Sequence, residues 1–101
     1  MNMFLVLSYN INSGKEEELK TWLKKRGEPF WGSVPEVKSV ATYLRQLGLG
    51  QRPQVQTWLE IPNFTSLAFL DKWKTDPERK RVYGELFELA TDFNSSIVGE
   101  I

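Results

Sequence analysis

The chain has 101 residues, and its 13 basic and 13 acidic side chains give a formal net charge of zero. This length argues for a single domain spanning residues 1–101, and the balanced charge provides no overall field to attract nucleic acid or an anionic membrane. Cysteine and histidine are both absent, which excludes disulfides and thiolate metal sites and removes the commonest general base and haem ligand. Proton transfer would have to use Asp, Glu, Lys or Tyr.

The first predicted element is a strand from Phe4 to Ile11, because this segment is rich in residues that favour β-structure. It has no basic flank before it and no small-residue cleavage site after it, and it is far shorter than the roughly 20 apolar residues of a membrane span. We therefore expect no signal peptide, no membrane association and a cytoplasmic location.

A helix is predicted next, with Ser13 as its N-cap and Glu16 completing a capping box. Acidic residues in its first turn and basic residues near its end complement the helix dipole. We expect Gly27 to end this helix and the Pro- and Gly-containing segment that follows to be a connection. Phe30 and Trp31 in that segment are too apolar for a solvated loop, so we expect them to fold back onto the core.

Strands from Val37 to Leu47 and from Gln54 to Ile61 are predicted to form a hairpin. Side chains alternate along the second of these strands, so its two faces can be separated. The face predicted to meet the helices carries Val55, Thr57, Leu59 and Ile61. The opposite, open face carries Gln54, Gln56, Trp58 and Glu60.

The second helical region is expected to begin at Asn63 and to break near Lys74. It restarts at Asp76, a good N-cap that is followed by proline at the first helical position. Apolar residues then recur at helical spacing as far as Phe93, and the C-terminal residues 97–101 are predicted to form a short last strand.

This order of elements predicts an α+β domain with the ferredoxin-like βαββαβ arrangement, in which a four-stranded antiparallel sheet carries both helices on one face. The first strand is apolar on both of its faces. Since a strand of this kind is normally buried on both sides, something must cover the open face.

RNA is one candidate for the open face. RNA-recognition motifs share this topology and stack bases on aromatic side chains of the first and third strands. Trp58 matches one such position, but Gln56 and Leu7 stand where the other aromatics are required. We therefore expect no nucleic acid binding, and this alternative applies only if the open face is free.

Three segments carry a resemblance to a known superfamily. They are "YNINSGKEEELKTWL", "VPEVKSVATY" and "LEIPNFTSLAFLDKWKTDPERKRVYGEL". With them the chain resembles the dimeric α+β barrel superfamily, which includes antibiotic-biosynthesis monooxygenases and ethyl tert-butyl ether degradation proteins. In that superfamily two sheets pack open face to open face, so the resemblance implies a homodimer. The implied interface residues are Leu5, Leu7, Tyr9, Gln54, Gln56 and Trp58.

The resemblance also implies a ligand pocket between the helices and the sheet of each subunit. The candidates by position are Ser8, Asn10, Trp22, Tyr43, Trp73 and Tyr83. Together they would form an aromatic pocket for a planar or apolar molecule, with tyrosine and asparagine as polar anchors. The alternative for the Trp and Tyr residues at helical spacing is a structural role in the core.

The resemblance identifies no catalytic residue. Without histidine, neither the axial ligand of the haem-degrading members nor the base of the cyclising members has a counterpart here, and we expect no cofactor and no metal. Two functions remain open: a protein that binds a small ligand without a known reaction, and a cofactor-independent monooxygenase that acts on aromatic substrates. The sequence leaves open whether the protein is an enzyme.

One further segment, "KWKTDPERKR", is rich in charge. Its cationic residues are Lys72, Lys74, Arg79, Lys80 and Arg81, and Asp71, Asp76 and Glu78 lie among or beside them. We interpret the segment as a solvated helix face with balanced charges, and the alternative is a site that meets an anion.

Overall fold

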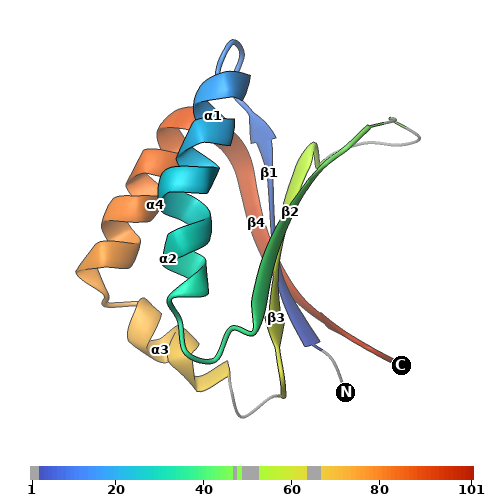
Figure 1. The fold of residues 1–101 in the computed structure, drawn as a ribbon, viewed down its shortest axis with the longest axis vertical. Coiled ribbons are helices and arrows are strands. Elements are labelled where there is room, and N and C mark those ends of the chain that lie inside the picture. Colours follow the sequence, from blue (N-terminus) through green and yellow to red (C-terminus); the bar gives the residue numbers. More distant parts are fainter. Residues whose placement is uncertain (1–2, 47, 49–52, 64–66) are drawn as a thin grey trace.

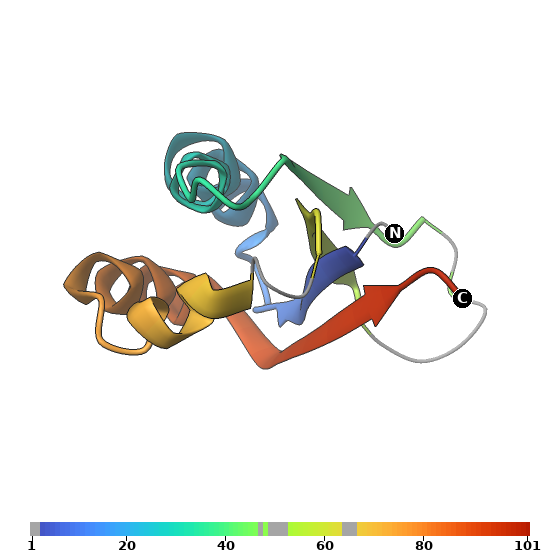
Figure 2. The same ribbon diagram turned by 90° about the horizontal axis from the view of Figure 1, so that it is seen from below.

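The computed structural model describes residues 3–46, 48, 53–63 and 67–101. The chain forms two layers, a sheet and a set of helices that packs against one face of it (Figure 1). Figure 2 shows the same two layers from below. In chain order the elements are β1 (Met3–Ile11), α1 (Glu16–Trp22), the π-helical turn η1 (Leu23–Gly27), α2 (Glu28–Gly32), β2 (Ser39–Leu44), β3 (Val55–Ile61), α3 (Phe69–Trp73), α4 (Pro77–Leu89) and β4 (Ala90–Gly99).

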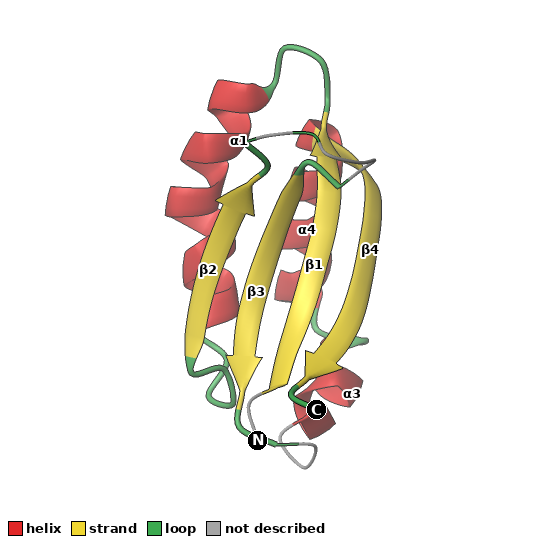
Figure 3. Cartoon of the chain, turned by 90° about the vertical axis from the view of Figure 1, so that its right-hand side faces the viewer, coloured by secondary structure: helices red, strands yellow, loops and turns green. Residues whose placement is uncertain are grey.

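The sheet has the strand order β2-β3-β1-β4, and each neighbouring pair is antiparallel. Figure 3 looks onto its open face, with the helices behind it. This topology confirms the predicted ferredoxin-like α+β fold, including the break in the second helical region. Within the described residues, no helix has the length and apolar character needed to cross a membrane.

Some predicted boundaries lie outside the described residues. The predicted helix that Asn63 would cap begins on residues 64–66, and the predicted end of the second strand and the turn after it fall on residues 47 and 49–52. The described part of that strand is shorter than predicted, because β2 starts at Ser39 and ends at Leu44.

The side of β1 that was predicted to form the dimer interface faces the helices instead. Leu5 lies opposite Leu59 and Leu7 lies opposite Thr57, so these side chains share the helix-facing side of the sheet. Leu5, Leu7 and Tyr9 are all buried in the core between the sheet and the helices. Their assignment to a dimer interface is therefore wrong.

The open face of β1 instead carries the residues of the other parity. Val6 lies opposite Trp58 and Ser8 lies opposite Gln56. Phe4 makes an edge-on ring contact with Trp58, with centroids 5.1 Å apart. Both faces of β1 are apolar, so only its register with β3 decides which face meets the helices.

Tyr9 shows how the core satisfies a buried polar group. Its hydroxyl hydrogen-bonds Thr57 Oγ1 at 2.9 Å, and Thr57 in turn hydrogen-bonds Thr42 Oγ1 at 2.9 Å. Burial raises the pKa of the Tyr9 phenol to about 12, so it remains protonated and able to donate. The hydroxyl chain links β1, β3 and β2 beneath the helices.

The first helix begins later than predicted. Lys15 occupies the N-cap position, and no side chain caps the helix. The chain leaves β1 through a turn in which Lys15 N–H donates to Asn12 O at 3.0 Å and Gly14 adopts a φ of 77°. Because this turn places Ser13 outside the first helical turn, the predicted capping box with Glu16 is wrong.

The first helix also continues past Gly27, which was predicted to end it. It passes through the π-helical turn η1 into α2, and this change of helical pattern directly precedes α2, whose second residue is Pro29, a residue without a backbone N–H to donate. Gly27 provides space instead, since a Cβ at this position would lie 2.5 Å from Trp22 Cζ3. Trp31 is fully buried in the core, which confirms the prediction that it folds back.

The last strand begins at Ala90, earlier than predicted, so Phe93 belongs to a strand and not to a helix. The pairing of β4 with β1 shifts register near this point, and Asp92 has a positive φ of 55°. Asn10 Nδ2 donates to Asp92 Oδ2 at 2.9 Å and holds this irregularity in place. The Phe93 ring contacts Tyr83, with centroids 5.5 Å apart.

Candidate functional site

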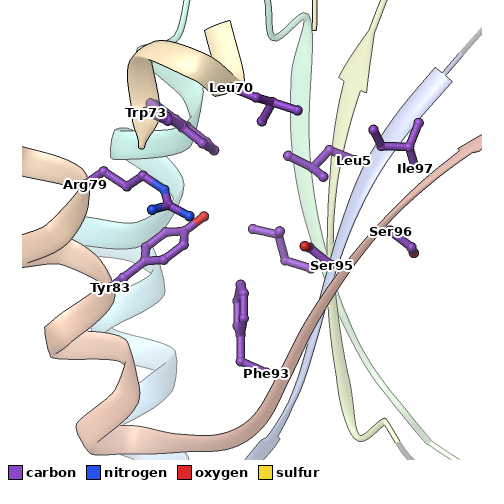
Figure 4. A pocket seen from close by; sticks show the side chains of 10 residues that line it. Leu5, Leu70, Trp73, Arg79, Tyr83, Phe93, Ser95, Ser96 and Ile97 are labelled. Carbon is purple, nitrogen blue, oxygen red and sulfur yellow. The ribbon is translucent and has the colours of Figure 1, made fainter. Parts of the chain in front are cut away.

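A cavity of about 340 Å³ lies between the α3–α4 pair and strands β1 and β4 (Figure 4). This volume is at the low end of the roughly 300–1,000 Å³ typical of small-molecule sites, which suits a ligand of about one or two aromatic rings. The lining is mainly apolar and aromatic. It consists of Leu5, Leu7, Leu70, Trp73, Arg79, Tyr83, Phe93, Ser95, Ser96 and Ile97.

The break between α3 and α4 creates the helical side of this cavity. Asp76 caps α4, since its Oδ1 accepts a hydrogen bond from Glu78 N–H at 2.9 Å, and Pro77 follows in the first turn. This confirms the predicted N-cap. At the break α3 turns away from the axis of α4 (Figure 1), and the helix-facing side of β4 is only partly covered, which leaves Ile97 43% exposed.

Aromatic side chains form one wall of the cavity and hold one another in place. The Trp73 and Tyr83 ring centroids are 6.4 Å apart, and Phe30 stacks on the far side of the group against Trp73 at 5.6 Å. Trp31 Nε1 donates a hydrogen bond to the Tyr83 hydroxyl at 3.3 Å. Burial raises the pKa of the Tyr83 phenol, and the hydrogen bond from Trp31 offsets part of that rise. Tyr83 is therefore a neutral hydroxyl at the cavity wall.

Arg79 is the charged residue of the cavity lining. Its Cζ lies 4.5 Å from the centroid of the Tyr83 ring and 5.8 Å from that of Trp73. Its Nε is buried and has no hydrogen-bond partner in the described part of the molecule. Figure 4 shows its guanidinium end between Trp73 and Tyr83, directed into the space between helices and sheet. The interpretation of this segment as a solvated face is wrong for Arg79, although the neighbouring Lys80 and Arg81 are exposed.

A groove on the molecular surface continues outward from the cavity and shares Trp73, Arg79, Tyr83 and Phe93 with it. Its remaining charged residues are Lys74, Asp76 and Lys80. With Arg79, three cationic side chains thus face one carboxylate along this approach.

Two of the predicted pocket residues, Trp73 and Tyr83, line the cavity. Trp22 has a structural role, since its Nε1 donates to Glu85 Oε1 at 2.9 Å between α1 and α4. Asn10 is also used structurally: besides its bond to Asp92, its Oδ1 accepts a hydrogen bond from Gln54 N–H at 3.0 Å.

The other two predicted pocket residues lie on the opposite side of the sheet. Ser8 and Tyr43 both pair across the sheet with Gln56, and Tyr43 is 59% exposed. Both are therefore misplaced as pocket residues, because the parity of β1 and β2 directs them to the open face.

Sequence reasoning missed Arg79, Phe93 and Ser95. Arg79 precedes Tyr83 by four residues, and this i,i+4 spacing places the two side chains together on one face of α4. Ser95 is brought to the cavity by its pairing with Leu7, which no local pattern reveals. Phe93 was assigned to a helix, so its contribution from β4 was not foreseen.

The open face has an aromatic groove of its own. It is lined by Phe4, Ser39, Ala41, Tyr43, Gln56 and Trp58. Trp58 Nε1 donates to Gln56 Oε1 at 3.2 Å, so these two predicted interface residues lie together on this surface. Gln54 lies at the end of the sheet, where its Oε1 accepts from Ile11 N–H at 2.8 Å.

Among the residues that the structure describes, no group of three or more carboxylates is close enough to hold an ion. The titratable side chains in the cavity lining are Arg79 and Tyr83. They provide a cation and a neutral hydroxyl, which suit the holding of a ligand.

No protein-family model matches the sequence, and no curated protein matches it. Solved structures do match its fold. An ethyl tert-butyl ether (EthD) family protein from Bacillus halodurans has a TM-score of 0.71 at 12% identity, with 100% of each chain covered. A DABB family protein with a ferredoxin-like fold from Mesorhizobium loti has a TM-score of 0.73 at 11% identity, covering 99% of this chain and 97% of its own.

A third similar structure is a dimeric protein of unknown function with a ferredoxin-like fold from Bacteroides fragilis. Its TM-score is 0.63 at 13% identity, with 98% of this chain and 96% of the other covered. The chain has the ferredoxin-like fold of these proteins. The resemblance read from the sequence is therefore confirmed at the level of the fold.

Proposed function

We propose that this protein is a homodimer and that each subunit binds a small aromatic or apolar molecule in the cavity beneath α3 and α4. The cavity carries the proposal, because it combines an aromatic wall with a few polar groups and an open approach, the usual composition of a small-molecule site. Trp73 and Tyr83 would contact the ligand face, and Arg79 and Ser95 would orient it.

The dimer part of the proposal rests on the open face. Phe4, Val6 and Trp58 give this side of the sheet apolar side chains that a second copy would cover, and the Bacteroides fragilis protein of the same fold is dimeric. Native mass spectrometry should give twice the mass of the chain, and Trp58→Glu should shift it to the single mass. A monomeric wild-type protein would contradict the dimer and return RNA to consideration for this face.

Ligand binding can be tested by the quenching of tryptophan fluorescence with neutral and anionic naphthalene derivatives. Ser95→Phe places a ring in the cavity and should weaken binding by at least about tenfold, as expected when an apolar pocket is filled. Ser95→Ala is the matched control: it removes the hydroxyl without filling the cavity, so it should weaken binding much less than Ser95→Phe. Failure to saturate with the whole panel, or equal binding by Ser95→Phe, would contradict the proposal.

A second candidate is a cofactor-independent monooxygenase that acts on phenols. It is favoured by the position of Arg79 beside Tyr83, since a fixed cation in an apolar site stabilises developing negative charge on a bound phenol. Oxygen consumption with phenols and hydroquinones, measured for wild type and Arg79→Met, tests it. The absence of consumption across the panel would leave ligand binding as the function.

A further inference from the structure

We propose that the cavity binds an apolar or aromatic carboxylate and that Arg79 holds its anionic end. This rests on the proposed function, namely that the cavity is a ligand site, and it adds the chemical class of the ligand.

The guanidinium of Arg79 is stacked but not fully hydrogen-bonded. It lies over the Tyr83 ring at 4.5 Å, and its buried Nε makes no hydrogen bond within the described residues. A buried donor without a partner costs stability, and an acceptor that arrives from outside the chain would remove this cost. Stacking uses the face of the guanidinium, and part of its edge interacts with the Tyr83 hydroxyl. The Nε side of the edge is therefore the part that can meet a planar acceptor.

Other arginines of the helical layer differ in this respect. Arg26 bonds Glu85 with Nε at 2.9 Å and with Nη2 at 3.0 Å. Arg81 pairs with Glu78 at 3.0 Å. No ion pair links Arg79 to a carboxylate in the described ranges of the chain, and none of the residues lining the cavity is acidic. The site thus carries one uncompensated positive charge, which a monoanionic ligand would neutralise.

The surroundings favour a carboxylate over a phosphate. A phosphate carries more charge and more acceptor oxygens than one guanidinium and one serine hydroxyl satisfy, and the rest of the wall is apolar. A carboxylate matches the two-pronged edge of a single arginine. In Figure 4, Ser95 lies across the cavity from Arg79, on the β4 side, where its hydroxyl is available for a second polar contact.

The groove that leads to the cavity also carries positive charge. Lys74 and Lys80 line the outer groove together with Arg79 and the carboxylate of Asp76, and Lys74 also pairs with Asp71 at 3.5 Å on the exposed surface. Cationic side chains along an approach raise the local concentration of anions and speed their association. The body of the ligand would then lie against Trp73 and Phe93, which offer ring faces and edges.

The test compares naphthoate with its neutral isostere naphthamide by titration calorimetry. Wild type should prefer the carboxylate by about tenfold or more, the value of a charge-assisted hydrogen bond in an apolar site. Arg79→Met keeps an apolar side chain of similar length and should remove this preference while naphthamide affinity changes little. Arg81→Met is the matched control, because it removes a cation from the same helix outside the cavity lining and should keep the preference.

The outcomes separate this inference from the proposed function. Equal affinity of wild type for the two probes, or a preference that survives Arg79→Met, overturns the carboxylate assignment and leaves the cavity as a site for neutral ligands. Binding of neither probe overturns both proposals. If Arg79→Met fails to fold, Arg79→Lys replaces it: the charge remains but the two-pronged edge is lost, so the preference should shrink, and an unchanged preference counts against the inference.

Discussion

Helix α4 meets two different environments along its length. On the side of the first helix, Glu85 accepts hydrogen bonds from both Arg26 and Trp22, so cation, carboxylate and indole satisfy one another. On the side of α3, Arg79 lies against Trp73 and Tyr83 without a carboxylate partner in the described structure. We call the first region the seam and the second the cavity.

The seam and the cavity differ in how fully their side chains pack and form hydrogen bonds with one another. The seam is closed: Trp22 packs edge-on against Trp31, with centroids 5.9 Å apart, and Gly27 admits the Trp22 ring where a Cβ would not fit. The cavity is bordered by side chains of the same types, but it retains space and an unused donor. Substitutions should therefore cost stability at the seam and mainly affect binding at the cavity.

The largest effect is expected for Gly27→Ala. The new Cβ would lie 2.5 Å from Cζ3 and 2.9 Å from Cη2 of Trp22, and the Trp22 ring is held by its bond to Glu85. Overpacking of this kind lowers the free energy of unfolding by about 1–3 kcal/mol. Urea unfolding measures it, and an unchanged midpoint would show that the seam is less closely packed than the comparison requires.

The next prediction compares Arg26 at the seam with Arg79 at the cavity. Arg26→Met removes both bonds from its side chain to Glu85 and should lower the melting temperature. Arg79→Met loses a stacking contact but also removes a buried unpaired donor, so the free energy of unfolding should stay within about 0.5 kcal/mol of wild type. Thermal unfolding of both variants tests these two expectations. A larger loss for Arg79→Met would make this arginine structural and would weigh against its role in binding.

The third prediction concerns the stability of the folded protein at acid pH. The hydrogen bond from Arg26, followed by that from Trp22, holds the pKa of Glu85 below its usual range. Because the pKa in the unfolded chain is higher, about 4.3, the ion pair stabilises the folded state above that pH. This stabilisation is lost as pH falls through the folded-state pKa. The contribution is small, because solvent screens this exposed pair.

Glu85→Gln tests this prediction. The variant should be less stable than wild type at neutral pH and closer to it in strong acid, as measured by urea midpoints at both conditions. A constant difference between the two proteins across pH would show that the charge of Glu85 contributes nothing at the seam.

The fold could be predicted from local pattern, but one face assignment could not. Alternation along β3 separates its buried and open faces, because only one of them is apolar. β1 has large apolar residues on both faces, with Phe4 and Val6 on one and Leu5 and Leu7 on the other. Its orientation follows from its register with β3, which is a tertiary property.

The candidate site was predicted in part for the same reason. Trp73 was found because it lies at a break that the proline and the capping aspartate indicate, and Tyr83 was found from its place in the last helix. Trp22 was included wrongly because its partner, Glu85, is 63 residues away in the chain. Arg79 was excluded because the surrounding charges balance in sequence, whereas in space the acidic Glu78 pairs with Arg26 and Arg81.

The last prediction is a small stabilising effect at the mouth of the cavity. Gly84 is exposed within α4 and lines the outer groove, and a Cβ there meets no atom within 4 Å. Gly84→Ala should therefore raise the free energy of unfolding by about 0.4–1 kcal/mol, since alanine restricts the unfolded chain and favours the helix. It is the opposite of the result expected for the same substitution at Gly27.

The Gly84→Ala variant also tests which surface joins the two subunits. If the dimer forms through the open face of the sheet, the outer side of α4 remains in solvent, and the added methyl group should change neither the native mass nor ligand affinity. A loss of stability in Gly84→Ala, measured by urea unfolding at the same protein concentration, would mean that another surface covers α4. The helix layer and not the open sheet face would then be the place where subunits meet, and the approach to the cavity would be formed by both.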